Sequence, residues 1–425
     1  MPLTHSRFCN AGAPPAPFFI RPLSRKSAVG TFLCLRSYNL TMQRILCLLA
    51  LCASPAFAQQ PSISRLDGAK IAPAEIDAAV AKSIHAASVT GAGIAIFNRG
   101  KIVYMKAYGW RGTAKHLPLT PDSVMTAASL TKPAFAAMVM GLVHDGVIDL
   151  DKPVYEYLPK PLPEYPRYAD LASDPRYKQI TLRMLLDHTS GFPNWRWVMP
   201  GKKLHIYFTP GSRFAYSGEG IDLAQMVVET VTKQSVTDLM NARLFQPLGI
   251  SRTSMVWQPR FETDYANAYD EQGKSLGPQR RQRGDAAGSM QTTLRDYARF
   301  VQSVLDGPIP DPHSRQLMLS PQIQIVSAHE FPSLDTETNP AADRAIRLSY
   351  GLGWGLFWTP YGKAFFKEGH DEGWRHYVVC FDQPKSGVLI MTNSSNGEDI
   401  YDALLRALIG DSFTPLEWEA FRPAH

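Results

Sequence analysis

The segments of this chain that favour β-strands lie on both sides of a long helical stretch, and this arrangement limits the possible folds most. Residues 91–110 ("GAGIAIFNRGKIVYMKAYGW") read as two strands joined by a turn at 98–100. Strand-like runs return from residue 350 and continue to about residue 396. We therefore expect an α+β fold, in which one antiparallel sheet is built from both chain ends and flanked by helices.

Between these segments the chain has mostly helical character, over roughly residues 120–300. The first and last helices of the chain should pack on the sheet. A Pro- and Tyr-rich passage, 153–177, is expected to be a long ordered loop, and 306–346 is polar and Pro-rich with no clear period. Helices are predicted at 72–87, 129–144, 181–187, 221–244, 294–305 and 400–409.

The first 58 residues differ from the rest in charge and pattern. They contain six Lys and Arg and no acidic residue, which leaves 38 basic and 38 acidic residues in the remaining chain. Residues 42–58 have the short basic start, apolar stretch and "AFA" ending of a secretory signal peptide. Residues 1–41 then form an upstream extension or an over-called start outside the fold. The neutral remainder gives no sign of a nucleic-acid partner.

The mature chain is accordingly expected to begin near Gln59 and to be periplasmic or secreted. No later segment is long and apolar enough for a membrane helix. Four of the five cysteines lie in the leader, so Cys380 is alone in the mature chain and no intramolecular disulfide is possible there. Its position in the apolar run "YVVCF" predicts a buried, inert thiol.

The run "ASLTKPAF" (127–134) places a serine and a lysine three residues apart. One helical turn brings Ser129 and Lys132 onto the same face, where they can act as a nucleophile and its activator. The alternative is structural, because serine is also a preferred residue at a helix N-terminus. Alone, this pair is a weak signal.

Further motifs follow in order along the chain. The run "PGSRFAYSGEG" (210–220) places Tyr216 in a turn before a helix. The run "KEGHDEGWRHYVVCF" (367–381) places Lys367 at a strand start, followed by Gly369 and Gly373. Serine with lysine, then tyrosine, then lysine-x-glycine, in that order, is a far more specific pattern than any one of them.

This ordered set resembles the serine beta-lactamase-related family, which includes class C beta-lactamases, penicillin-binding DD-peptidases and esterases. The resemblance covers roughly residues 73–410 and implies a beta-lactamase/transpeptidase-like fold for a hydrolase domain spanning 59–425. Four more runs support it: "ITLRMLLDHTSGFP" (180–193), "PLTPDSV", "AAGSMQTTLRDYARF" and "YGLGWGLFW".

The resemblance implies a role for each residue of the set. Ser129 is the nucleophile that forms an acyl-enzyme, and Lys132 takes or relays its proton. Tyr216 is the second proton carrier, and Lys132 and Lys367 favour its phenolate. Whether Tyr216 or Lys132 is the general base stays open. The oxyanion hole is formed by the backbone N–H groups of Ser129 and His370.

The sequence departs from the family pattern at two substrate-binding positions. The tyrosine motif of class C enzymes usually ends in asparagine, whose amide binds the acylamino group of the substrate, but here the residue is Gly218. The lysine-glycine motif usually has Thr or Ser before Gly369, and here it has Glu368. An acid there repels a substrate carboxylate if it faces the cleft. The alternatives are that Glu368 points into solvent or pairs with an arginine.

Other candidate residues have simpler explanations. The run 273–277 matches G-x-S-x-G on paper, but a proline and a polar segment follow it instead of a helix. His188 is expected to have a structural hydrogen-bonding role. Trp195 and Trp197 either line the cleft or pack in the core.

A short segment near the C-terminus is rich in residues that can bind metals, but they alternate between the two faces of one strand. We therefore expect no metal and no cofactor. The residues concerned are His370, Asp371, Glu372 and His376.

The sequence thus predicts an exported serine hydrolase that acts through Ser129 on a small-molecule ester, amide or lactam. The two departures favour an esterase or amidase. The alternatives are a beta-lactamase or DD-peptidase, and a catalytically inactive binding protein on the same scaffold. The physiological substrate and the oligomeric state stay open.

Overall fold

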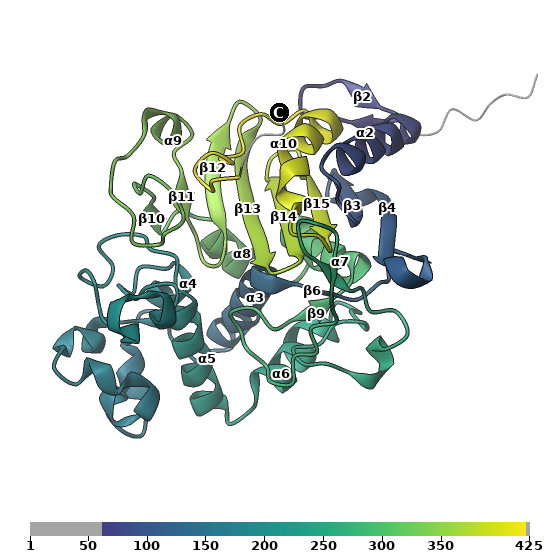
Figure 1. Ribbon diagram of the computed structural model, residues 1–425. Helices are drawn as coiled ribbons and strands as arrows, with labels where there is room; N and C mark the ends of the chain where they lie inside the picture. Colours follow the sequence, from purple (N-terminus) through teal and green to yellow (C-terminus); the bar gives the residue numbers. More distant parts are fainter. Residues whose placement is uncertain (1–61, 422–425) are drawn as a thin grey trace, which may run out of the picture. The chain divides into compact units, whose positions relative to one another are not determined.

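The computed structural model describes residues 62–421 (Figure 1). The upstream extension 1–41, the predicted signal peptide 42–58 and the expected mature start near Gln59 lie outside the described residues. Within 62–421, no helix is of sufficient length and apolar character to cross a membrane.

A nine-stranded sheet, antiparallel throughout, forms the centre of this unit and confirms the predicted α+β class. Strand β3 from the N-terminal side pairs with β15 from the C-terminal side, with Ile96 opposite Val388. Both chain ends therefore build one sheet. Its strands, in spatial order, are β10 (Ile323–Gln324), β11 (Ser349–Tyr350), β12 (Gly355–Thr359), β13 (Gly362–Asp371), β14 (Trp374–Phe381), β15 (Ser386–Thr392), β3 (Gly91–Asn98), β4 (Lys101–Gly112) and β5 (Leu117–Pro118).

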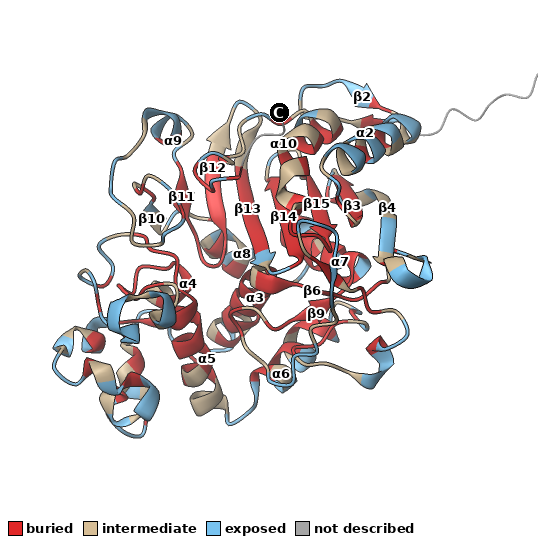
Figure 2. Cartoon of the chain, in the orientation of Figure 1, coloured by how far each residue is buried: buried red, intermediate tan, exposed pale blue. Residues whose placement is uncertain are grey.

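Both faces of the central strands are buried (Figure 2). Successive side chains of a strand point to opposite faces, so each strand contributes to two cores. Ile94 and Ile96 belong to the core under α2 (Pro73–Ala86) and α10 (Tyr401–Leu404). Ala95 and Phe97 belong to the core on the other face. That second core includes the apolar side chains of α3 (Thr131–His144) and α7 (Leu294–Asp306).

The inserted helical region is more broken than the sequence predicts. The helix expected over 221–244 is divided into α5 (Gly218–Thr232) and α6 (Val236–Met240). The break occurs because Lys233 adopts a left-handed conformation and Ser235 then caps α6 by accepting from the Asp238 N–H. A single polar turn, residues 232–235, ends one helix and starts the next.

Two other predicted segments also differ from the structure. The polar stretch 306–346 contains α8 (Pro312–Met318), α9 (Ala341–Ala345) and β10, although its sequence shows no period. The strand-like run from residue 350 is two short strands, β11 and β12, because Gly353 adopts φ = 82° between them.

The remaining elements are α4 (Leu182–Leu186) and the small strand pairs β1 (Ile63–Ser64) with β2 (Lys70–Ile71), β6 (Met125–Thr126) with β9 (Gln291–Thr292), and β7 (Ala268–Tyr269) with β8 (Ser275–Gly277).

Candidate active site

Ser129 lies in a 3₁₀ turn, Ala128–Leu130, which leads directly into α3. The predicted helix 129–144 therefore begins two residues later than expected. The turn follows β6, where the Ala127 N–H donates to the Met290 carbonyl at 2.8 Å. Ala128 has φ = 49°, in the left-handed region that non-glycine residues rarely adopt, at a cost of about 1–3 kcal/mol. The residue before the candidate nucleophile is thus held in a strained conformation by its surroundings.

Lys132 reaches Ser129 from the first turn of α3. Its Nζ lies 2.9 Å from Ser129 Oγ and donates to the Ala287 carbonyl at 2.7 Å. The side chain is almost completely buried. Burial, and next the nearby charge of Lys367, lower the pKa of Lys132 to about 7. A large fraction of this amine is therefore neutral at neutral pH.

Tyr216 lies in the segment before α5, with its buried ring between the two lysines. The Nζ atoms of Lys132 and Lys367 are 4.9 and 4.6 Å from the ring centre. Its hydroxyl approaches Ser129, which acts to lower its pKa, but no group of the described residues completes a hydrogen bond with it. Burial, and next the charge of Glu368, dominate and raise the pKa of Tyr216 well above 10. The phenol is therefore protonated in the free protein, although the resemblance implied a favoured phenolate.

Lys367 and Glu368 are buried neighbours on β13 and form an ion pair with each other. The sequence predicted that Glu368 faces the cleft, points into solvent or pairs with an arginine. The pairing with Lys367 is an additional finding of the structure. A buried ammonium is costly without a counter-charge, and the adjacent carboxylate supplies it. Glu368 also lines the cleft, so its charge can still act on a ligand there.

Two further acids, Glu330 and Glu419, lie beside Glu368. Oxygen atoms of the three carboxyl groups are all within 4.8 Å of one another. Burial raises the pKa of both Glu330 and Glu419 well above 4.5, and neighbouring carboxylates add to this shift, so burial favours the protonated form of both acids. The ammonium of Lys367 provides the cation that Glu368 requires, and we assign no metal to this cluster.

This carboxyl cluster is the part of the site that sequence reasoning missed. Glu330 lies in the stretch without a clear period and Glu419 near the end of the chain, and neither belongs to a motif. The structure joins them through a backbone hydrogen bond from Glu330 to Trp418 and a 2.6 Å hydrogen bond from the Tyr377 hydroxyl to Glu419. Their nearness comes from tertiary packing alone.

Strand β13 lies directly against the 3₁₀ turn that carries Ser129. A Cβ atom on Gly369 would be 2.8 Å from the Ala127 carbonyl oxygen and 3.0 Å from Leu130. Only glycine permits this approach. His370 follows on the same strand, and its half-exposed side chain lines the cleft. The assignment of the Ser129 and His370 N–H groups to an oxyanion hole remains a prediction.

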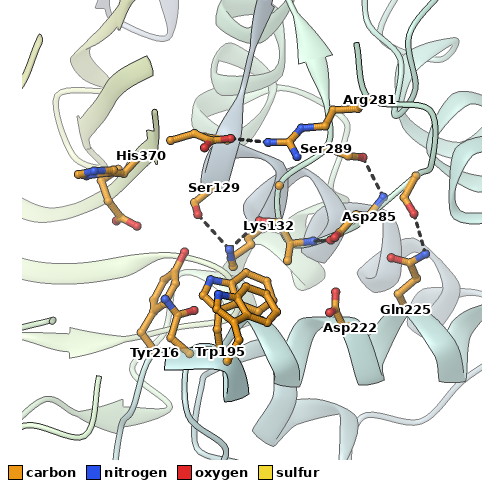
Figure 3. A pocket seen from close by; sticks show the side chains of 18 of the residues that line it. Ser129, Lys132, Trp195, Tyr216, Asp222, Gln225, Arg281, Asp285, Ser289 and His370 are labelled. Carbon is orange, nitrogen blue, oxygen red and sulfur yellow. Dashed lines mark hydrogen bonds and ion pairs between the residues drawn. The ribbon is translucent and has the colours of Figure 1, made fainter. Parts of the chain in front are cut away.

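The site opens into a cleft of about 1090 Å³. In Figure 3, a dashed line joins Lys132 to Ser129, the Tyr216 hydroxyl points toward the same serine, and Trp195 lies beside Tyr216. Trp195 and Trp197 both line the cleft, and their rings stack with centres 4.4 Å apart and an angle of 13° between planes. Of the two alternatives for these tryptophans, the structure therefore supports the cleft.

The other candidate residues lie elsewhere or have structural partners. His188 is fully buried under Tyr216, and its Nδ1 accepts from the Ser217 N–H at 3.2 Å. Burial and the two lysines lower the pKa of His188 well below 6.5, so it is neutral. Ser275 is exposed on β8, without the strand-to-helix turn of a nucleophile elbow. Cys380 on β14 is fully buried, as predicted.

Comparison with known proteins agrees with this geometry. The family model described as beta-lactamase matches residues 76–411, which is most of the chain. The chain therefore belongs to the beta-lactamase family, whose members include serine hydrolases.

Among curated relatives, esterase EstB of Burkholderia gladioli is 30% identical over 216 residues, which are 45% of this chain and 53% of the esterase. Protein flp of Staphylococcus aureus (strain COL) is 26% identical over 220 residues, 48% of this chain and 41% of the relative. The chain thus spans about half the length of the curated relatives it matches.

Solved structures share the fold at lower identity. The octameric penicillin-binding protein homologue from Pyrococcus abyssi has a TM-score of 0.65 at 21% identity, covering 81% of this chain and 79% of that one. The D-alanine carboxypeptidase AmpC from Burkholderia cenocepacia has a TM-score of 0.63 at 18% identity. The match covers 79% of this chain and 98% of the carboxypeptidase. These likenesses establish the fold.

Proposed function

We propose that this protein is an exported esterase or amidase that hydrolyses uncharged substrates through an acyl-enzyme on Ser129. One observation carries the proposal: the Nζ of Lys132 lies 2.9 Å from Ser129 Oγ, and burial brings its pKa to about 7. A serine hydroxyl is a weak nucleophile unless an adjacent base removes its proton. A neutral lysine at hydrogen-bonding distance is such a base.

In the proposed acylation step, Ser129 Oγ attacks the carbonyl carbon of the substrate while Lys132 Nζ takes the hydroxyl proton. The carbonyl oxygen becomes an oxyanion, held by the N–H groups of Ser129 and His370. The bond to the leaving alkoxide or amine then breaks. The leaving group receives a proton, and the acyl group remains on Ser129 as an ester. Water attacks this ester in the same way, which releases the carboxylic acid and restores Ser129.

Tyr216 suits the role of proton donor in this sequence. Because its pKa is raised, the phenol carries a proton that it can pass to the leaving group, while Lys132 is the base. Tyr216 is then a phenolate, and Lys132 passes the proton it took from Ser129 to this phenolate oxygen, which restores the neutral amine and the phenol. This assignment of the two roles is part of the proposal.

The preference for uncharged substrates follows from Lys367 and Gly218. The ammonium of Lys367 already pairs with Glu368, so it is poorly placed to attract a substrate carboxylate. The missing side chain at Gly218 removes a hydrogen-bond donor to an acylamino group. A lost hydrogen bond in a buried site is worth roughly 1–3 kcal/mol. We therefore propose weak or absent turnover of penicillins and D-Ala-D-Ala peptides. The 30% identity to an esterase, over 45% of this chain, supports ester hydrolysis.

Intact-mass analysis tests this proposal directly. Wild-type protein and Ser129→Ala are each exposed to a serine-reactive phosphonate, a penicillin and a short-chain neutral ester, and ester hydrolysis is followed in parallel. We expect phosphonate labelling and ester hydrolysis by the wild type, and neither by Ser129→Ala. An unlabelled, inactive wild type would support the binding-protein alternative. Rapid penicillin hydrolysis would overturn the substrate preference.

Export is the other part of the proposal and rests on residues 42–58 of the sequence. N-terminal sequencing of the protein from an expressing bacterium should find a chain that starts near Gln59 in the periplasmic or extracellular fraction. A cytosolic chain that retains Met1 would contradict export without affecting the proposed chemistry.

A further inference from the structure

The glycine at position 218 is explained by a neighbouring side chain. Gly218 is the first residue of α5 and has an ordinary helical backbone, so its conformation does not require glycine. A Cβ atom there would lie 2.3, 2.4 and 2.7 Å from the Cη2, Cζ2 and Cζ3 atoms of Trp195. The indole ring of Trp195 therefore fills the space that a side chain at position 218 would take.

The loop that carries Trp195 is fastened to the start of α5. The Gly218 N–H donates to Asn194 Oδ1 at 3.0 Å, and the Glu219 N–H donates to the Asn194 carbonyl at 3.0 Å. The Arg196 guanidinium donates two hydrogen bonds, of 2.8 and 2.7 Å, to the fully buried carboxylate of Glu219, and the Arg196 backbone N–H donates a third at 3.2 Å. These contacts on both sides of Trp195 fix its ring over Gly218.

The fixed ring is part of a larger aromatic surface beside the nucleophile. Trp197 stacks on Trp195 and is 54% exposed, so one face of the pair remains available to a ligand. Phe331 lines the same cleft and lies edge-on to Tyr216, with ring centres 5.3 Å apart. Aromatic rings bind other aromatic rings well in stacked and edge-on geometries, whereas an indole face offers an amide only a weak N–H···π contact in place of a full hydrogen bond.

We infer that Trp195 and Trp197 bind the acyl group of the substrate, and that the preferred substrates are esters of aryl-substituted carboxylic acids that lack an acylamino group. The inference rests on the proposed function and narrows its substrate class. The family resemblance assigns the region beside residue 218 to the acyl group. An aryl ring there covers the exposed indole face and leaves no amide group without a hydrogen-bond partner.

Two esters with the same leaving group test this inference. The second-order rate constant kcat/KM is measured for 4-nitrophenyl phenylacetate and 4-nitrophenyl acetate. We expect the wild type to prefer the phenylacetate by tenfold or more, and Trp195→Ala to lose most of this preference. Trp110→Ala is the matched control, since Trp110 is 40% exposed on β4 and does not line the cleft. An unchanged preference in Trp195→Ala would overturn the inference.

A double variant tests the shared space. Gly218→Asn should lower the melting temperature and reduce kcat/KM for both esters, because the new side chain collides with Trp195. Combined with Trp195→Ala, the same asparagine should be tolerated, and the melting temperature should return close to that of Trp195→Ala alone. Equal losses for Gly218→Asn in both backgrounds would show that the two positions do not compete for space.

A binding measurement separates this inference from the proposed function. Calorimetric titration of Ser129→Ala with methyl phenylacetate and methyl acetate requires no turnover. Tighter binding of the phenylacetate, lost in Ser129→Ala/Trp195→Ala, supports the aromatic site even if the wild type hydrolyses no ester. Equal affinities for the two esters would overturn the aromatic site even if hydrolysis is observed.

Discussion

Lys132 is a buried amine whose charge is set by its neighbours. Burial and Lys367 lower its pKa, whereas Glu368, Asp285 and Asp222 raise it, and the result is a pKa of about 7. This value makes the residue a usable base near neutral pH and also makes its ammonium form costly to bury. Both consequences can be measured.

The pH dependence of ester hydrolysis should report this pKa. Lys132 must be neutral to accept a proton, so kcat/KM for a neutral ester should rise with pH and level off, with a midpoint near pH 7. Glu368→Gln removes a negative charge that raises the pKa of Lys132, so the midpoint should move to lower pH. Glu262→Gln, at an exposed acid paired with Arg280, should leave it unchanged. A midpoint above pH 9 in the wild type would exclude Lys132 as this base.

Stability should respond to the same residue. The pKa of Lys132 is lower in the folded chain than in the unfolded chain. Between pH 7 and 10.5 the unfolded chain therefore binds more protons. The free energy of unfolding of the wild type should then increase as the pH rises through this range. Lys132→Met should therefore be inactive yet more stable than wild type at pH 7. This advantage should shrink by roughly 1–3 kcal/mol at pH 9.5. Urea denaturation at both pH values measures it, and an advantage that grows with pH would contradict the assignment.

Local sequence motifs were sufficient to find Lys132 beside the candidate nucleophile, and also the tyrosine and the second lysine that lie next to Lys132. Ser129 and Lys132 are one helical turn apart, and Tyr216 and Lys367 lie in short runs with recognisable neighbours. The partner of Glu368 could not be predicted in this way, because adjacent strand residues usually point to opposite faces. The contact of Glu330 and Glu419 with Glu368 could not be predicted either, because only tertiary packing brings these residues together.

At the scale of elements, the site depends on how closely β13 approaches the 3₁₀ turn of Ser129. Gly369 makes this approach possible, and the 3₁₀ turn leads directly into α3. The strands and the long helices were predictable from apolar periodicity and composition. The break between α5 and α6 was not predicted, because it depends on the left-handed conformation of one residue, Lys233, which is not a glycine.

Gly369→Ala should separate the strand from the turn. The new methyl group would contact the Ala127 carbonyl and Leu130, so the N–H of His370 should move away from Ser129 and kcat should fall by tenfold or more. Gly141→Ala is a matched control in the last turn of α3, where a Cβ atom meets nothing within 4 Å. It should raise stability by about 0.5–1 kcal/mol and leave kcat unchanged. Steady-state kinetics and thermal melts of both variants decide the outcome, and full activity in Gly369→Ala would contradict the close approach.

At the scale of the described molecule, the C-terminal segment after α10 closes the core beside the site. Trp418 and Phe421 are buried in the core that also contains Tyr216, and Glu419 joins the carboxyl cluster. The end of the chain thus supports the residues that surround the nucleophile. This role could not be predicted from the sequence, because the segment is short and its apolar residues show no period.

Trp418→Ala should show how strongly the site relies on this segment. Removal of a large buried side chain costs about 3–5 kcal/mol, and ester hydrolysis should weaken because Glu330 and Glu419 lose their packing. Glu417→Ala changes the neighbouring exposed residue and should alter neither property. Urea denaturation and kcat/KM are measured for both variants. Equal stability of Trp418→Ala and wild type would contradict the role of the segment.

The pairing of β15 with β3 also has a consequence for biosynthesis. Ser129 leaves the ribosome early, but Lys367, β15 and Glu419 follow only after most of the remaining chain has been made. At a typical elongation rate of about 5–20 residues per second, the last of these groups appears roughly 15–60 s after the serine. Until then β3 lacks its C-terminal partner strand and Lys132 lacks the nearby cation that helps to lower its pKa. The nascent polypeptide therefore lacks part of the surroundings of Ser129 and Lys132 until residue 419 has been translated.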